Sequence, residues 1–177
     1  MGKIILVLGG ARSGKSSFAV ETAAKTVKRV IFIATAVGID REMKQRISAH
    51  QIARPKHWIT KEAPYNITAA LRAIPADAKI VIIDCLTIYI TNLIMKKRSD
   101  DIIIKDLSNL FAFIKKSNFT AIIVSNEVGL GLVPDTKLGR RFRDLAGAVN
   151  KLAAQKADQA YFLVSGIALN LKNKRNS

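Results

Sequence analysis

The chain has 177 residues, of which 49% are hydrophobic, and this suits one domain with a full core. Lys and Arg total 29 against 13 Asp and Glu, and the formal net charge of +16 points to anionic partners such as nucleotides. Because these cations are spread along the chain without an aromatic-interleaved block, we expect no nucleic-acid partner. No apolar run approaches the roughly 18 residues of a membrane span. The single cysteine and an apolar start that continues into a glycine loop favour a cytoplasmic protein without disulfides.

Apolar, β-branched runs alternate with helical patterns along the whole chain. The runs predict buried strands at residues 3–8, 30–34, 79–84, 120–126 and 160–166. Helices are predicted at residues 16–27, 40–53, 66–74, 86–97, 101–116 and about 136–157. Strands that alternate with helices in this way are typical of an α/β fold with a mainly parallel central sheet flanked by helices. We expect one domain over residues 1–172 and a frayed basic tail at 173–177.

The first predicted strand leads into a glycine-rich loop. Its residues are Gly9, Gly10, Ala11, Arg12, Ser13, Gly14, Lys15 and Ser16, which match the pattern GxxxxGK[ST]. The glycines let backbone N–H groups turn toward phosphate oxygens, and Lys15 supplies a cation for the terminal phosphates. A helix follows directly, and its N-terminus favours anions. The motif therefore predicts a P-loop nucleotide-binding fold.

Such a loop needs an acidic partner for a metal ion. The predicted strand 79–84 ends in Asp84, the usual Walker B position at the carboxyl end of a strand. Together with the Ser16 hydroxyl, Asp84 is a candidate ligand for Mg²⁺. The alternative is that Asp84 only caps the helix that begins near Leu86, and both roles are compatible.

Both histidines of the chain lie in the stretch RISAHQIARPKHW, residues 46–58. At about 100° per residue, Arg46 and Arg54 lie about 40° to either side of His50 on the predicted helix. Nearby positive charge keeps an imidazole neutral and nucleophilic, so His50 is a candidate for a covalent nucleotide intermediate. A structural or simple binding role for His50 is the alternative. His57 follows Pro55, and we expect it to pack together with Trp58. A base-stacking platform formed by the two residues is the less favoured alternative.

A second glycine-containing loop, NEVGLGLVP at residues 126–134, follows the predicted strand 120–126. Ligands bind at this end of a parallel sheet, so Glu127 is a candidate general base or metal ligand. Loop packing or a subunit contact is an equally good interpretation of the position.

Five blocks in order carry a resemblance across nearly the whole chain: LGGARSGKSSFAVE, IATA, EMKQRISAHQIARPKHW, DCLTIYITNL and SNEVGLGLVPDTKLGRRFRDLAGAVNKLAAQKAD. Together they resemble the bifunctional adenosylcobinamide kinase/adenosylcobinamide-phosphate guanylyltransferases of cobalamin biosynthesis. The resemblance implies phosphorylation of adenosylcobinamide by a nucleoside triphosphate. It further implies transfer of GMP from GTP to that phosphate, which gives adenosylcobinamide-GDP and pyrophosphate.

The resemblance also assigns roles to residues. The guanylyl group passes through a histidine that falls on His50, and Lys15 acts with it in catalysis. Nucleotide contacts fall on the loop Gly9 to Ser16 and on Ala34, Thr35, Ala36, Gln51, Ile52, Ala53, Arg54, Glu62 and Asp84. GTP and ATP are the implied nucleotide substrates, Mg²⁺ the implied metal, a corrinoid the second substrate, and a homotrimer the implied assembly. In this chain Gln51, Ile52 and Ala53 replace a more polar run of some relatives, so their contacts are expected from the backbone.

Two other functions remain open on the residues alone. A single-function P-loop kinase for a small molecule would use His50 only to bind substrate or phosphate. A basic P-loop ATPase acting on nucleic acid would show a steep salt dependence of binding, but the dispersed charge argues against it.

Overall fold

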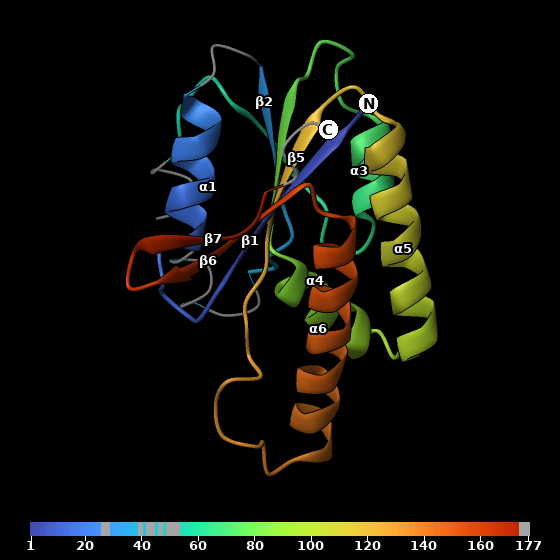
Figure 1. Ribbon diagram of the computed structural model, residues 1–177. Coiled ribbons are helices and arrows are strands. Elements are labelled where there is room, and N and C mark those ends of the chain that lie inside the picture. The colour runs from blue at the N-terminus through green and yellow to red at the C-terminus, as the bar shows by residue number, and fades with distance from the viewer. Residues whose placement is uncertain (26–28, 39–40, 42–44, 46–47, 49–53, 174–177) are drawn as a thin grey trace.

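The computed structural model describes residues 1–25, 29–38, 41, 45, 48 and 54–173 of the chain. Seven strands form one sheet in the order β3-β2-β4-β5-β1-β6-β7 (Figure 1). Their bounds are β1 Lys3–Gly9, β2 Val30–Ala34, β3 Ile59–Glu62, β4 Ile80–Asp84, β5 Thr120–Val124, β6 Gln159–Val164 and β7 Ile167–Asn173. Neighbouring strands are parallel except for the antiparallel pair β6–β7. This confirms the predicted α/β fold with a mainly parallel sheet.

Helices cover both faces of the sheet, as continuous apolar strands require. Their bounds are α1 Lys15–Ala24, α3 Ile67–Arg72, α4 Leu86–Met95, α5 Asp100–Lys116 and α6 Lys137–Lys156. Figure 1 shows α1 on one side of the sheet and α3, α4, α5 and α6 on the other. The described part of the chain is therefore a three-layer α/β sandwich with the sheet between two layers of helices.

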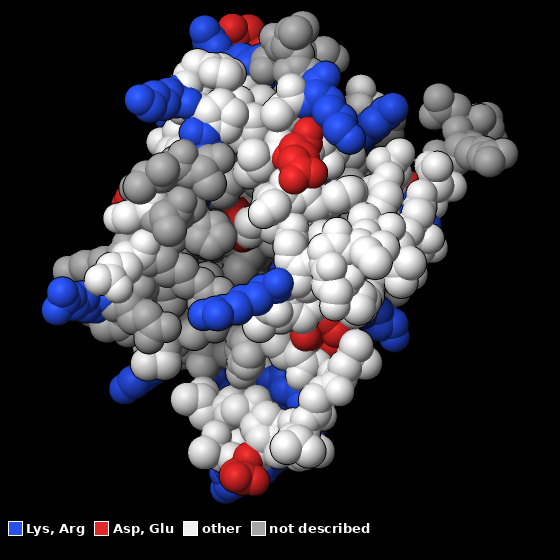
Figure 2. All heavy atoms as spheres, turned by 90° about the vertical axis from the view of Figure 1, so that its left-hand side faces the viewer, with Lys and Arg blue, Asp and Glu red and all other residues white. Residues whose placement is uncertain are grey.

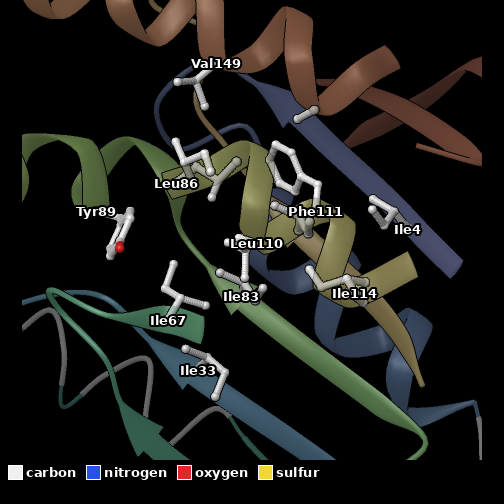
Figure 3. Close-up of a cluster of buried hydrophobic side chains, with 14 of the residues drawn as sticks. Ile4, Ile33, Ile67, Ile83, Leu86, Tyr89, Leu110, Phe111, Ile114 and Val149 are labelled. Atoms are coloured by element: carbon white, nitrogen blue, oxygen red, sulfur yellow. The ribbon is translucent and has the colours of Figure 1, made fainter. Parts of the chain in front are cut away.

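The larger half of the core lies between the sheet and the group of four helices. Figure 3 shows Leu110, Phe111 and Ile114 of α5 directed toward Ile83 of β4 and Ile4 of β1. Those five side chains are at most 2% exposed, so the face of α5 that packs against the sheet excludes water. Burial of this kind is worth about 1.5 to 3 kcal/mol for each large apolar side chain. The spacing of the apolar residues in α5 thus selects which face of that helix meets the sheet.

The smaller half of the core lies on the α1 side. It is built from Val7, Phe32, Ile82 and Val124 of the sheet with Ala19 and Ala23 of α1. Trp58 is 8% exposed and joins this cluster. The prediction that Trp58 packs is confirmed, whereas His57 is exposed to solvent, so the packing role predicted for that residue is wrong. The turn in which Trp58 N–H donates to the Pro55 carbonyl at 3.0 Å directs the indole inward and leaves His57 outside.

Two strands were not expected from the sequence. The edge strand β3 has the sequence ITKE and is mostly exposed, so it lacks the apolar run that marks a buried strand. The other edge strand, β7, pairs with β6 through a turn at Ser165 and Gly166, where the prediction had a single strand over residues 160–166. Asn173, assigned to the frayed tail, is the last residue of β7 and lies opposite Gln159.

Charged side chains are dispersed on the face shown in Figure 2. The Lys and Arg residues that the structure describes there stand apart from one another and form no continuous basic groove. None of the described helices is long and apolar enough to cross a membrane.

Candidate functional site

The predicted phosphate loop connects β1 to α1 in a conformation that demands glycine at two positions. Gly9 and Gly14 have φ angles of 152° and 91°, values that residues with a Cβ atom rarely adopt. A Cβ on Gly9 would also lie 2.5 Å from the Leu163 carbonyl oxygen of β6. The loop is braced from outside, because Gly166 N–H donates to the Ser13 carbonyl at 3.0 Å. The turn between β6 and β7 therefore supports this loop.

Lys15, the first residue of α1, is folded back over the loop. Its side chain is in a residue only 6% exposed, and its ammonium donates to the Gly10 carbonyl and, at 3.4 Å, to the Ser13 hydroxyl. These hydrogen bonds hold the positively charged ammonium within the loop, at the place where the sequence predicts that phosphate oxygens bind. Ala11 and Arg12 at the tip of the loop are exposed.

Three of the predicted site residues end neighbouring strands in one row. Ala34 of β2 lies opposite Glu62 of β3 on one side and opposite Asp84 of β4 on the other. Asp84 in turn lies opposite Val124 of β5. Parallel strands bring their carboxyl ends to one edge of the sheet, which explains why residues distant in sequence meet there. Of the three, Glu62 is exposed, while Ala34 and Asp84 are half-buried.

One strand separates Asp84 from the predicted phosphate loop. In the sheet β5 lies between β4 and β1, and Val124 pairs with Asp84 on one side and with Val7 on the other. The residues that follow β5 therefore occupy the space between the loop and Asp84. The sequence analysis placed Asp84 near the loop but gave no order for the strands, so this insertion is new information from the structure.

Ser16 and Asp84 nevertheless reach a common space on the α1 side of the sheet. They line a pocket of about 270 Å³ together with Ser17, Val20, Glu21, Phe32 and Arg54. A serine hydroxyl and one carboxylate at the edge of an open pocket fit Mg²⁺, which keeps several waters and takes few protein ligands. Among the described residues no group of three or more His, Cys, Asp and Glu side chains gathers into a metal site.

Arg54 brings the region after the predicted histidine helix to this pocket. Its guanidinium lies 3.4 Å from the centre of the Phe32 ring and donates to the Thr60 hydroxyl at 3.5 Å. Burial lowers the pKa of Arg54, and the negative charge of Asp84 partly opposes this by raising it. A guanidinium stays charged in proteins, so a partly desolvated cation faces the pocket beside the Asp84 carboxylate.

Thr35 is used to build the edge of the sheet. It is fully buried, and its hydroxyl donates to the Cys85 carbonyl at 2.9 Å and accepts from Cys85 N–H at 2.8 Å. Its backbone N–H donates to the Asp84 carbonyl at 3.1 Å, and its carbonyl accepts from the Asn92 amide at 2.8 Å. Thr35 therefore holds the chain on either side of the Asp84–Cys85 peptide, and any nucleotide contact of this segment falls to the half-exposed Ala34 and Ala36.

The only cysteine stands beside the site without being reactive. Cys85 is buried, and burial first, with the Asp84 charge second, raises the pKa of its thiol to about 11. The thiol is therefore neutral at physiological pH, and it contacts the Thr87 hydroxyl at 3.1 Å. This makes Cys85 a packing residue of the site and not a nucleophile.

The predicted nucleophile lies outside the described residues, as do Gln51, Ile52 and Ala53. Arg41, Gln45 and Ser48 are helical, in the range where we predicted the helix that carries His50. The nearest described neighbour of His50 in sequence that was also a predicted site residue is Arg54, which lines the pocket.

Several polar residues at this edge were missed by the sequence analysis. Thr87, Ser125 and Asn150 are buried and hydrogen-bonded around the end of β5, and Glu21 lines the pocket. A buried asparagine on the apolar stripe of a helix is a signal that could have found Asn150, because such a group needs a partner. Thr87 and Glu21 have no comparable signal, since their importance depends on which strands become neighbours.

Comparison with known proteins agrees with this arrangement. The family model described as cobinamide kinase / cobinamide phosphate guanyltransferase matches residues 5–171. The bifunctional adenosylcobalamin biosynthesis protein CobP of Pseudomonas aeruginosa is 39% identical over 96% of this chain and 97% of its own length. The proteins named CobU of Salmonella typhimurium and Escherichia coli are 36% and 35% identical, each over 96% of this chain and 99% of its own length. The match thus includes the loop, the carboxyl edge of the sheet and the β6–β7 hairpin, and the chain is an enzyme that belongs to the cobinamide kinase / cobinamide phosphate guanyltransferase family.

Proposed function

We propose that this enzyme catalyses two successive reactions on one corrinoid substrate. The first transfers a phosphoryl group from a nucleoside triphosphate to the hydroxyl of the aminopropanol arm of adenosylcobinamide. The second transfers GMP from GTP to that phosphate and releases pyrophosphate, which gives adenosylcobinamide-GDP. The family membership supports the pair of activities, and the site described above supports the binding of a nucleotide in both.

The observation that carries the proposal is the enclosed ammonium of Lys15 in the Gly9–Ser16 loop, with Ser16 and Asp84 on one pocket beside it. Backbone N–H groups and a buried cation stabilise the negative charge of a triphosphate, and that charge grows on the leaving oxygen during transfer. Ser16 and Asp84 would hold Mg²⁺, which supplies further charge neutralisation for the phosphates. Arg54, Glu62 and the Ala34–Ala36 segment are the other proposed nucleotide contacts, together with residues 51–53.

The guanylyl transfer runs through His50 as two displacements. A ring nitrogen of neutral His50 attacks the α-phosphorus of GTP, a P–N bond forms, and pyrophosphate leaves with the electron pair of the broken P–O bond. A phosphate oxygen of adenosylcobinamide phosphate then attacks the same phosphorus and releases His50. Support for this part comes from the sequence RISAHQIARPKHW and from the family, together with the position of Arg54 at the pocket.

Labelling with GTP that carries the label on its α-phosphate tests the covalent step. With Mg²⁺ present, the wild-type protein is expected to retain label in an acid-labile, alkali-stable bond, as a phosphoramidate does. His50→Ala is expected to lose the label and the guanylyl transfer while it still phosphorylates adenosylcobinamide. His57→Ala is the matched control, because His57 is exposed and lies in the same segment, and it should label as the wild type does.

Two outcomes would reject the proposal in different ways. Full labelling of His50→Ala would show that another residue carries the nucleotide. Phosphorylation of adenosylcobinamide without any pyrophosphate release from GTP would instead identify a single-function kinase.

We also propose that the enzyme is a homo-oligomer, with a trimer as the expected state. The segment between β5 and α6 extends below the rest of the described molecule in Figure 1. Its Leu130, Leu132 and Val133 are 80%, 96% and 65% exposed, and Leu138 on the first turn of α6 is 52% exposed. Large apolar side chains gathered on a projecting loop are typical of a surface that a second subunit covers.

A further inference from the structure

The residues after β5 reach the predicted phosphate loop directly. Ser125 N–H donates to the Val7 carbonyl at 3.0 Å, and Glu127 N–H donates to the Gly9 carbonyl at 2.9 Å. The chain thus continues alongside β1 as far as the first residue of the loop. Because Val124 also pairs with Asp84, the segment Ser125–Glu127 lies between the loop and the candidate metal ligand. The transferred phosphoryl group would sit in this interval.

Side chains from two helices hold that segment in place. Asn150 of α6 is 5% exposed; it accepts from the Ser125 hydroxyl at 2.7 Å and donates to the Asn126 carbonyl at 3.0 Å. The Asn126 amide donates to the hydroxyl of Thr87, on the first turn of α4, at 2.8 Å. Buried polar groups with all partners in place give a single, rigid arrangement. The two residues before Glu127 are therefore fixed from both sides.

Only one of the two carboxylate oxygens of Glu127 accepts a hydrogen bond within the described part of the chain. One oxygen, Oε1, accepts from Gly129 N–H at 2.7 Å, and a Cβ on residue 129 would come within 3.0 Å of that oxygen. In the described part of the chain the other oxygen has no hydrogen-bond partner, and the carboxylate forms no ion pair. The side chain is half-buried. One oxygen is thus anchored by the backbone while the other remains available as a proton acceptor.

We propose that Glu127 is the general base of the phosphoryl transfer, an inference that rests on the proposed kinase activity. The substrate hydroxyl oxygen forms a bond to the γ-phosphorus, and its proton passes to the free oxygen of Glu127. The bond between the γ-phosphorus and the oxygen that bridges it to the β-phosphate breaks, and that oxygen leaves with the electron pair on the nucleoside diphosphate. Asp84 is the poorer base, because it shares the pocket with Ser16 and, as the proposed Mg²⁺ ligand, would have its lone pairs engaged by the metal.

The test measures the two proposed reactions separately, in the wild-type enzyme and in variants. Glu127→Gln keeps the size and the acceptor for Gly129 N–H but removes the base. We expect phosphorylation of adenosylcobinamide at saturating substrates to fall by about 100-fold or more, with KM for adenosylcobinamide changed far less. Labelling of the protein by α-labelled GTP should stay at the wild-type level, which also reports that the variant is folded.

Asp135→Asn is the matched control, since it makes the same chemical change on an exposed residue of the same loop, and its kinase rate should stay within about twofold of the wild type. A kinase rate of Glu127→Gln equal to that of this control overturns the inference and leaves the proposed function intact. A parallel loss of both reactions that higher Mg²⁺ restores also overturns it, because that pattern identifies a metal ligand. A wild-type enzyme that cannot phosphorylate adenosylcobinamide would remove the proposed function and the role of Glu127 with it.

Discussion

Arg54 lines the pocket and makes several contacts there. Its guanidinium packs on the Phe32 ring, reaches Thr60 and lies near enough to Asp84 for that charge to affect its pKa. Packing on an aromatic ring fixes the plane of the guanidinium and leaves its edge for an anion. The resemblance implied a nucleotide contact at Arg54, and the pocket supplies a physical reason for it.

Arg54→Ala is expected to weaken GTP binding by about 10- to 100-fold, because a hydrogen bond to a charged group contributes about 1.5 to 3 kcal/mol. Isothermal titration of the variant with GTP measures this change in Kd. Arg54→Lys retains the charge without the planar contact to Phe32 and should give an intermediate Kd. An unchanged Kd in Arg54→Ala would mean that the side chain only packs.

At the scale of single residues, the sequence identified candidate groups for the chemistry but not their surroundings. The spacing of the motif makes Lys15 and Ser16 candidates, and that assignment stays a prediction. His57 and Trp58 are adjacent in sequence, yet one is exposed and the other packs in the core. Only the turn in which Trp58 N–H donates to the Pro55 carbonyl decides which of the two side chains points inward.

Among the elements, α6 lies where the helix at about residues 136–157 was predicted, but its apolar residues are buried only from its centre onward. Leu145 and Val149 are at most 4% exposed, while Leu138 near the first turn of the helix is 52% exposed. The Thr136 hydroxyl caps the helix by accepting from Gly139 N–H at 3.0 Å. The helix therefore begins well before it reaches the sheet, so periodicity locates the face of a helix and not how much of it is covered.

Polar side chains also connect neighbouring elements, and the hydrophobic periodicity of the sequence does not predict these contacts. Asp158, at the start of β6, accepts from Ile4 N–H of β1 at 2.8 Å and pairs with Lys115 of α5 at 2.6 Å. Both side chains are about a quarter exposed, so the pair is only partly screened by water. This one carboxylate links two strands and a helix at the amino end of the sheet.

Asp158→Ala is expected to lower the free energy of unfolding by about 1 to 3 kcal/mol, since it leaves the N–H of Ile4 and the ammonium of Lys115 without this acceptor. Urea denaturation followed by circular dichroism measures the loss. Asp158→Asn keeps an acceptor for Ile4 N–H, so its loss should be smaller. Equal stability of Asp158→Ala and the wild type would show that water replaces the carboxylate at no net cost.

For the whole molecule, the strand order decides the site. Alternation of strands and helices predicted a parallel sheet but not the order of its strands. In the sheet β5 lies between β4 and β1. That order places Glu127 beside the predicted phosphate loop. The loop that contains the exposed Leu130, Leu132 and Val133 follows the same strand and is the surface proposed for a subunit contact.

Leu132→Asp is expected to reduce the oligomer to smaller species, because a charge buried in an apolar contact costs far more than an exposed one. Light scattering coupled to gel filtration gives the mass. Ile102→Asp is the control: Ile102 is 48% exposed and belongs to α5, not to the loop, and its variant should keep the wild-type mass. An unchanged mass for Leu132→Asp would exclude this loop from the interface.

The sequence by itself determined the fold class and the family, and it gave Gly9–Ser16 as the predicted phosphate loop and Asp84 as the candidate metal ligand. These features depend on the local spacing of residues and on apolar runs that can be recognised without knowing which segments pack together in the fold. Only the tertiary structure decided that β5 separates the loop from Asp84, that Arg54 joins Phe32 at the pocket, and that Asn150 and Thr87 hold the chain before Glu127. The physical reason is that the same local sequence pattern is compatible with several orders of parallel strands. Which side chains become hydrogen-bond partners depends on that order.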